Sequence, residues 1–101
     1  MQLYRGRLEV MYDLLLAIET MGPYCNKYRI KQHSRESYVQ MARYLDWALT
    51  SNLVEEDRPD RQLMPTYSIT TRGTKCIQLI DELRLFIDFS SQAPTRYLYD
   101  Y

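Results

Sequence analysis

The side chains in this sequence that most clearly suggest a binding function are basic residues clustered in one segment. Five Lys and Arg residues lie between Gly22 and Leu45, where Glu36 is the only acid: Lys27, Arg29, Lys31, Arg35 and Arg43. Acidic residues gather elsewhere, and the net charge of the chain is zero. Such a cluster predicts a surface for negatively charged groups such as phosphates. The alternative is a solvated helix pair whose charges cluster by chance.

Groups suited to catalysis or metal binding are sparse. The chain has one histidine, His33, and two cysteines, Cys25 and Cys76, which lack the spacing of metal ligands. Its three glycines stand apart, so no glycine-rich phosphate loop is present. We therefore expect no enzymatic activity, no metal and no cofactor. Two cysteines are too few for a disulfide framework, and we expect both to be reduced thiols in a cytoplasmic protein.

Length and composition predict one globular domain. The chain has 101 residues, of which 46% are hydrophobic. A domain of this size buries only about 60–70% of the surface of its unfolded chain, so a second copy would be a natural supplement. No apolar run reaches the roughly 20 residues needed to cross a bilayer. The N-terminus lacks the pattern of a signal peptide, and we expect no membrane partner.

The elements that position the basic cluster begin with two helices. Apolar residues at helical spacing predict a largely buried helix over about Arg7 to Met21, which Gly22-Pro23 ends. A short basic helix follows, from a cap at Asn26 to about His33.

A third helix is predicted to start at Tyr38. Ser37 and Gln40 have the spacing of a capping box, in which the serine oxygen accepts from a backbone N–H at the start of the helix. Asn52 falls where a left-handed residue would end this helix, with Leu53 as the accompanying apolar contact. The helix has two faces. The predicted buried stripe is Tyr38, Met41, Leu45, Ala48 and Leu49, and the opposite face carries Val39, Gln40, Arg43, Asp46 and Trp47.

The second half of the chain predicts a hairpin and a last helix. Leu53–Glu56 and Tyr67–Ile69 have the composition of strands, and the loop between them is too long for a tight turn. Thr70 can cap a helix over Thr71–Phe89. We expect residues 1–89 to form the domain and residues 90–101 to form a flexible tail.

The predicted last helix carries more apolar surface than one small core needs. One stripe consists of Ile77, Ile80 and Ile87, and the other of Cys76, Leu79, Leu83 and Phe86. We expect the first to cover the core and the second to face another copy of the chain, because its spacing suits a coiled-coil seam.

The order of these elements predicts a winged helix-turn-helix, an α+β fold that is mainly α. It has three helices, a β-hairpin wing and a long C-terminal helix. In such a motif the third helix is the recognition helix and the second crosses the nucleic-acid backbone.

Three segments of the sequence resemble a known family. They are GRLEVMYDLLLAI at Gly6–Ile18, YRIKQHSRESYVQMARYLDWALTSNLV at Tyr28–Val54 and YSITTRGTKCIQLI at Tyr67–Ile80. In order and spacing they are similar to the small archaeal winged-helix DNA-binding proteins, including the ArnR-like group, over about Arg5 to Phe89. The chain departs from the family pattern at Asn52, where glycine is usual, and in a longer, more acidic wing loop. The resemblance implies a dimeric DNA-binding transcription regulator.

Several residues then become candidates for contact with double-stranded DNA. Cations of the second helix and the following turn would bind phosphates: Lys27, Arg29, Lys31 and Arg35. At the start of the third helix stand Ser37 and Tyr38, although Tyr38 also suits the core. Gln40 and Arg43 have the side chains that pair with adenine and guanine, but Gln40 is also needed by the capping box. Arg58 and Arg61 stand near the tip of the wing, beside acidic neighbours that weaken a DNA contact. Trp47 can pack on the wing, at a dimer interface or on the sugar-phosphate backbone.

Three functions remain open on the sequence alone. The first is a homodimeric regulator that binds a specific DNA sequence. The second is a winged-helix module for protein interaction without DNA binding, and the third is a non-specific chromatin protein. Zero net charge argues against the third, because non-specific affinity comes mainly from cations that displace counterions.

Overall fold

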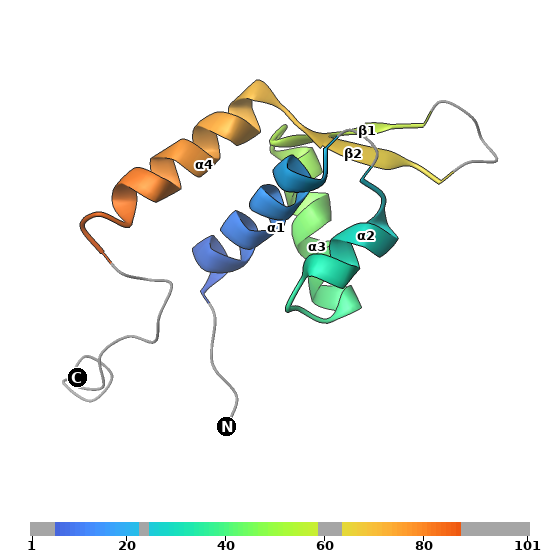
Figure 1. Ribbon diagram of the computed structural model, residues 1–101, viewed down its shortest axis with the longest axis horizontal. Helices are drawn as coiled ribbons and strands as arrows, with labels where there is room; N and C mark the ends of the chain where they lie inside the picture. The colour runs from blue at the N-terminus through green and yellow to red at the C-terminus, as the bar shows by residue number, and fades with distance from the viewer. Residues whose placement is uncertain (1–5, 23–24, 59–63, 88–101) are drawn as a thin grey trace.

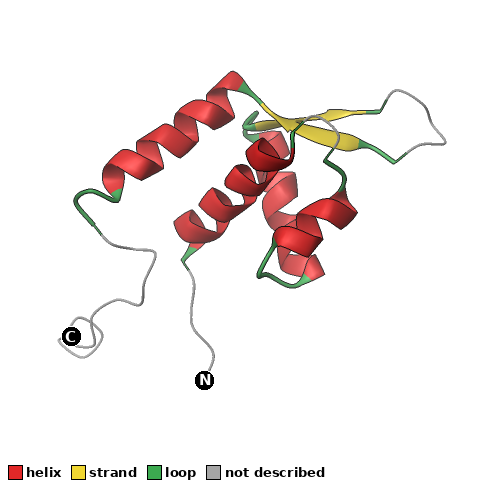
Figure 2. Ribbon diagram, viewed as in Figure 1, coloured by secondary structure: helices red, strands yellow, loops and turns green. Residues whose placement is uncertain are grey.

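The computed structural model describes residues 6–22, 25–58 and 64–87. Their elements follow the order α1 (Arg7–Met21), α2 (Lys27–His33), α3 (Tyr38–Thr50), β1 (Val54–Asp57), β2 (Thr66–Ile69) and α4 (Thr71–Leu83). Figure 1 shows α1, α2 and α3 grouped together, the hairpin extending to one side and α4 to the other. The structure confirms the winged helix-turn-helix fold predicted from the sequence, with helices dominating over the single hairpin (Figure 2).

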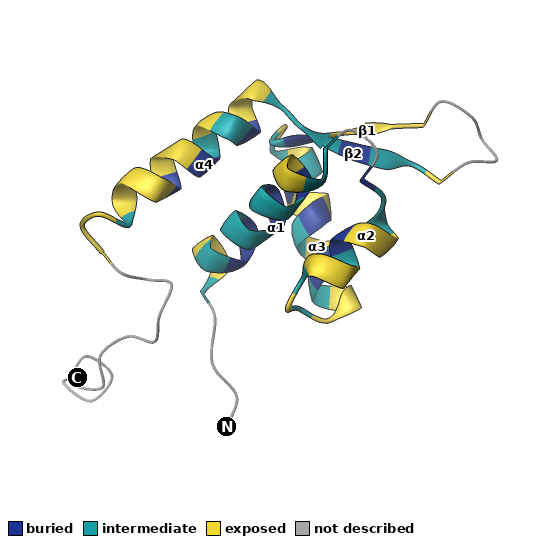
Figure 3. Cartoon of the chain, in the orientation of Figure 1, coloured by how far each residue is buried: buried dark blue, intermediate teal, exposed yellow. Residues whose placement is uncertain are grey.

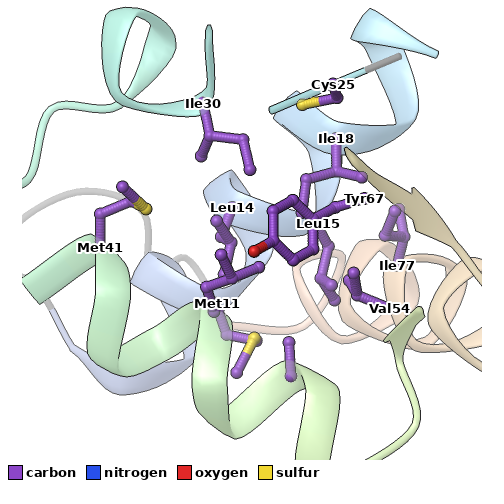
Figure 4. Packing of buried hydrophobic residues seen from close by; sticks show 12 residues of the cluster. Met11, Leu14, Leu15, Ile18, Cys25, Ile30, Met41, Val54, Tyr67 and Ile77 are labelled. Atoms are coloured by element: carbon purple, nitrogen blue, oxygen red, sulfur yellow. The ribbon is translucent and has the colours of Figure 1, made fainter. Parts of the chain in front are cut away.

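The core forms where α1 meets every other part of the fold. Leu15 and Ile18 of α1 are almost fully buried, with Ile30 from α2 and with Met41 and Leu45 from α3. The strands contribute Val54 and Tyr67, and α4 contributes Ile77 (Figure 4). The buried residues of α1 and α3 recur at helical spacing, so burial of one face of each helix holds the bundle together.

Local signals in the sequence fix both ends of α3. The Ser37 side chain accepts a hydrogen bond from the Gln40 backbone N–H at 3.2 Å, which confirms the first half of the capping box. At the other end Asn52 has a φ of 62°, the left-handed conformation predicted for it. The Leu53 N–H donates to Ala48 O and the Asn52 N–H donates to Leu49 O, the two bonds of a Schellman motif. Asn26 caps α2 through the Arg29 N–H, also as predicted.

The hairpin is antiparallel and pairs Val54 with Ile69 and Asp57 with Thr66. β1 lies one residue later than the predicted Leu53–Glu56, because Leu53 belongs to the Schellman motif that ends α3. Cys25 forms a β-bridge to Tyr67, whose N–H donates to Cys25 O at 2.7 Å. Cys25, which precedes α2, therefore lies beside the hairpin.

The last helix is shorter than predicted. It ends at Leu83 rather than Phe89, and a turn follows in which the Leu85 N–H donates to Glu82 O and the Phe86 N–H to Leu83 O. Ile87 is 55% exposed, so its predicted place in the core is wrong, although Ile77 and Ile80 are buried. Tertiary packing sustains most short helices, and the residues after Ile80 have little of it.

Side-chain contacts hold α4 against α1. The Tyr12 hydroxyl donates to the Asp81 carboxylate at 2.7 Å, and the Arg84 guanidinium lies over the Tyr12 ring, 4.9 Å from its centroid. The hydrogen bond to Asp81 is the main reason that the pKa of Tyr12 is raised. At the start of α4, Thr70 caps the Gly73 N–H and donates to Asn52 O. These contacts attach both ends of α4 to the bundle.

Arg61 and the predicted tail at residues 90–101 lie outside the described residues. Among the residues that are described, no helix has the length and apolar character to cross a membrane.

Candidate nucleic-acid interface

α3 carries both buried and exposed residues, so it presents an outward face (Figure 3). Met41, Leu45 and Ala48 fix the inward side of the helix. Since successive residues turn by about 100° around a helix, Val39, Arg43 and Asp46 point almost directly away from the core. All are exposed, and Val39 is 68% exposed. These three residues form the outward face of α3.

Two predicted positions on α3 need correction. Tyr38 does not belong to the buried stripe, because it is 52% exposed in the first turn of the helix. Its place at the rim leaves it available for contact with a ligand. Gln40 is half-buried and lies on the flank of α3 rather than at the centre of its outward face. Gln40 lies about 100° from the core direction that Met41, Leu45 and Ala48 set. Tyr38 is closer to that direction, and it is exposed at the first residue of the helix.

The predicted phosphate-binding cations differ in how strongly they are engaged within the protein. Arg35 pairs with Asp13 of α1 at 3.2 Å, and Arg58 pairs with Glu56 of β1 at 3.1 Å. Within the described ranges, the other predicted cations form no ion pair: Lys27, Arg29, Lys31 and Arg43. These four cations lie on α2 and α3, two helices that contact each other in the bundle.

Tyr67 of the hairpin has Glu56 beside it and Tyr38 of α3 within electrostatic range. Glu56 lies opposite Tyr67 in the hairpin and accepts hydrogen bonds from the Arg58 guanidinium. Burial is the largest cause of the raised pKa of Tyr67, followed by the charge of Glu56, and Tyr38 lies close enough to add to it. The base of the wing and the first turn of α3 are therefore neighbours.

The wing strand β1 is strongly acidic. Glu55, Glu56 and Asp57 are all exposed, and Arg58 is the cation that follows them. Because three carboxylates repel phosphates, the described part of the wing does not resemble a phosphate-binding surface. α2 and α3 consequently carry the positive part of the candidate interface.

Trp47 packs against its own helix. Its ring lies 5.7 Å from that of Tyr44, tilted by 49°, and the residue remains 48% exposed. This contact is none of the three roles considered from the sequence, which stay predictions. One side of the indole ring is left accessible at the C-terminal half of the exposed face.

Neither thiol is exposed. Cys25 is buried and Cys76 is partly buried, and both are free, as predicted. Burial raises the pKa of each, more than the nearby guanidinium of Arg29 or Arg72 lowers it. Both therefore stay protonated at neutral pH, and neither has the character of an activated nucleophile. In the part of the chain that is described, no group of three or more His, Cys, Asp and Glu side chains converges as a metal site would require.

Val39 and Asp46 were predicted to lie on the exposed face of α3 but not to contact DNA. Neither has a base partner as familiar as those of glutamine and arginine. Helical spacing alone could have identified both residues, because they lie on the side of α3 away from the buried Met41, Leu45 and Ala48.

Several solved structures have folds similar to that of this chain. The sequence matches no protein-family model and no curated protein. The chain is similar to the DNA-binding protein Sso10a-2 from Sulfolobus solfataricus, with 24% identity, a TM-score of 0.68 and coverage of 81% of each chain. It is also similar to a PadR family transcription regulator from Clostridium difficile, with 17% identity, a TM-score of 0.64 and coverage of 82% of this chain and 92% of that one.

A third similar structure is the AF1382 protein from Archaeoglobus fulgidus, with 15% identity and a TM-score of 0.60. It is matched over 77% of this chain and 86% of its own. At these identities the likeness concerns the fold. It agrees with the winged-helix architecture predicted from the order of elements.

Proposed function

We propose that this protein is a DNA-binding transcription regulator that inserts α3 into the major groove. The observation that carries the proposal is that α2 and α3 together carry four cations without an ion pair among the described residues, one of them, Arg43, on the exposed face of α3. Lys27, Arg29 and Lys31 bind phosphates and set the position of the protein on the duplex. Arg43 reaches a base edge, with guanine as its natural partner.

The remaining predicted contacts fall into two groups. Ser37, Tyr38 and Gln40 lie at the start of α3, where a recognition helix meets the bases or the adjacent backbone. Arg35 and Arg58 contribute only after they exchange Asp13 and Glu56 for phosphates. Arg61 belongs to the same proposal from its place in the sequence. Two proteins of similar structure, a DNA-binding protein and a PadR family transcription regulator, support this general class.

The proposal includes a cytoplasmic homodimer that forms through the last helix. Cys76, Leu79 and Leu83 lie on one flank of α4, and Phe86 follows in the turn beyond it. Leu79, Leu83 and Phe86 are all exposed, and Phe86 is 84% exposed. Each such side chain gains roughly 1.5–3 kcal/mol when a partner covers it. A two-fold dimer would place two recognition helices about 34 Å, or a multiple of that distance, apart on DNA.

The acidic wing supports a second candidate function, a winged-helix module that binds another protein. Glu55 and Asp57 present an exposed anionic edge that DNA would repel but a basic protein would not. DNA binding remains the better explanation, because it also accounts for the free cations of α2 and α3.

Selection of bound duplexes from a random pool at moderate salt tests the proposed function. A DNA-binding homodimer is expected to enrich a palindrome, and the same selection with Lys27, Lys31 and Arg43 all changed to alanine is expected to enrich nothing. Failure of the unmodified protein to retain any duplex would reject DNA binding and leave the protein-interaction module. Enrichment of an asymmetric half-site would support binding but contradict the symmetric dimer.

A further inference from the structure

Three exposed side chains of different chemistry follow one another along the outward face of α3. Val39 is apolar, Arg43 is a cation and Asp46 is an anion. Their spacing of four and three residues places them in one line along the helix. Neither Arg43 nor Asp46 forms an ion pair with any described residue. The three side chains are therefore presented to whatever α3 contacts.

Asp46 restricts what can lie against this line. A carboxylate accepts hydrogen bonds but donates none, and in the major groove only the amino groups of cytosine and adenine donate. Guanine and thymine present acceptors that would repel the Asp46 carboxylate at short range. A groove-facing acid also weakens binding to phosphates in general. Asp46 is compatible with α3 in a groove only where a base amino group meets it.

Val39 is also compatible with few groups of the major groove. Its side chain neither donates nor accepts, and it stands in the first turn of α3, where recognition helices approach the bases. The apolar feature of the major groove is the methyl group of thymine. Contact with that methyl group would remove the exposed valine from water, which favours association.

Arg43 stands between the two. Its guanidinium suits the O6 and N7 acceptors of guanine. Arg43 and Asp46 are separated by about 4.5 Å along the helix axis, comparable to the base-pair step of about 3.4 Å. The two side chains can therefore reach the two bases of one G·C pair or those of neighbouring pairs.

We propose that Val39, Arg43 and Asp46 determine the DNA sequence that the protein selects. Val39 contacts a thymine methyl group, Arg43 contacts guanine and Asp46 accepts a hydrogen bond from the amino group of cytosine. This inference rests on the proposed function, because it assigns base contacts to α3 in the major groove. It adds that the anion on α3 selects a base, while the cations of α2 supply general affinity.

The first test compares sequences selected from a random duplex pool by four forms of the full-length protein. Wild type is expected to enrich guanine, cytosine and thymine at defined positions. Asp46→Asn is expected to enrich adenine where wild type takes cytosine, because the asparagine amide pairs with adenine. Val39→Ser is expected to lose the thymine preference, and serine and valine have similar helix propensities. Glu19→Gln, which removes an exposed acid on α1, is the control and is expected to select the wild-type sequence.

The second test measures the contribution of the thymine methyl group to binding. The best selected duplex is made with deoxyuridine in place of the selected thymidine, which removes one methyl group and leaves the hydrogen-bonding groups unchanged. Wild type is expected to bind this duplex about fourfold more weakly, the equivalent of one buried methyl group. Val39→Ser is expected to bind the two duplexes equally. Circular dichroism of each variant verifies that the helices remain folded.

The outcomes separate this inference from the proposed function. If wild type retains no duplex, the proposed function fails and the inference fails with it. If wild type selects a sequence but Asp46→Asn and Val39→Ser select the same one, DNA binding stands and the inference is wrong. Equal binding of thymidine and deoxyuridine duplexes by wild type would overturn the role of Val39.

Discussion

At the scale of single residues, the useful distinction is between charges that are free and charges that are already neutralised. Arg43 and Lys31 belong to the first group, while Arg35 is held by Asp13 and Arg58 by Glu56. An engaged cation must give up its carboxylate before it can bind a phosphate, so its net contribution to affinity is smaller. The free cations of α2 and α3 are consequently the positions where substitution has the clearest effect.

Arg43→Ala is expected to weaken binding to the best duplex by about 1–3 kcal/mol and to relax selection at one base pair. Lys31→Ala is expected to weaken binding to all duplexes alike and to lower the slope of log affinity against log salt by about 1. Titration by gel shift at several salt concentrations measures both effects. Lys75→Ala, an exposed lysine on α4, is the charge-matched control and is expected to change neither quantity. Unchanged binding by both test variants would rule out the assigned surface.

The tyrosines of the core predict how stability depends on pH. The pKa of Tyr67 is raised above its ordinary value of 10.0, mainly by burial and then by the Glu56 carboxylate. The folded state therefore favours the neutral phenol more than the unfolded state does. This contribution to stability is fully present below about pH 10 and is lost as the pH rises through the folded pKa. We expect the free energy of unfolding to fall between about pH 9 and pH 12.

Urea unfolding across this range measures the effect, with Tyr67→Phe for comparison. The variant lacks the ionisable hydroxyl, so its decline at high pH is expected to be smaller than that of wild type. Tyr12, whose pKa is also raised, is still present in the variant and leaves a residual decline. Parallel curves for the two proteins would show that ionisation of Tyr67 does not contribute.

At the scale of elements, the contact between α4 and the end of α3 determines where the last helix begins. Thr70 bonds both the Gly73 N–H and Asn52 O, and the Arg72 side chain donates to Ser51 O at 2.9 Å. Gly73 is buried against this junction, and a Cβ atom there would collide with the carbonyl oxygen of Leu53. The glycine is needed for this close approach of helix and loop.

Gly73→Ala is expected to destabilise the protein by about 1–3 kcal/mol, the range for overpacked sites. The close neighbour is a backbone oxygen, which cannot turn aside as a flexible side chain can. Chemical denaturation measures the loss. Gly6→Ala is the matched control, because no atom lies within 4 Å of a Cβ at that position. Equal stability of the two variants would mean that α4 can shift at little cost.

At the scale of the whole molecule, the unexplained feature is the apolar flank of α4. Leu79 and Leu83 remain exposed, and the turn beyond them adds Leu85 and Phe86. α1 covers the opposite side of the helix through Tyr12, so it does not screen this flank. A second copy of the chain is the partner assigned to it under the proposed function.

Leu83→Glu is expected to convert the dimer into a folded monomer and to abolish tight DNA binding, because it places a charge in the apolar seam. Light scattering at concentrations on the order of tens of micromolar gives the molecular mass in solution. Gln78→Glu adds the same charge to an exposed position of α4 outside the seam and is expected to remain dimeric. A monomeric mass for the wild-type protein would reject the dimer.

The sequence by itself determined the order, type and most boundaries of the elements. Ser37, Asn52 and Thr70 act on backbone groups a few residues away, so their caps could be predicted without knowledge of the rest of the fold. The apolar spacing of α1 and α3 likewise identified most of the core, because burial on one side of a helix leaves a regular pattern.

Only the tertiary structure decided which side chains of the candidate site are available. The pairs Arg35–Asp13 and Arg58–Glu56, the exposure of Tyr38 and the flank position of Gln40 depend on how α1, α3 and the hairpin are placed relative to one another. The early end of α4 also followed from packing, since nothing in the local sequence stops the helix at Leu83. Local hydrogen bonds fix elements, whereas the exposure and pairing of a side chain depend on residues that are distant in the sequence and become neighbours only when the chain folds.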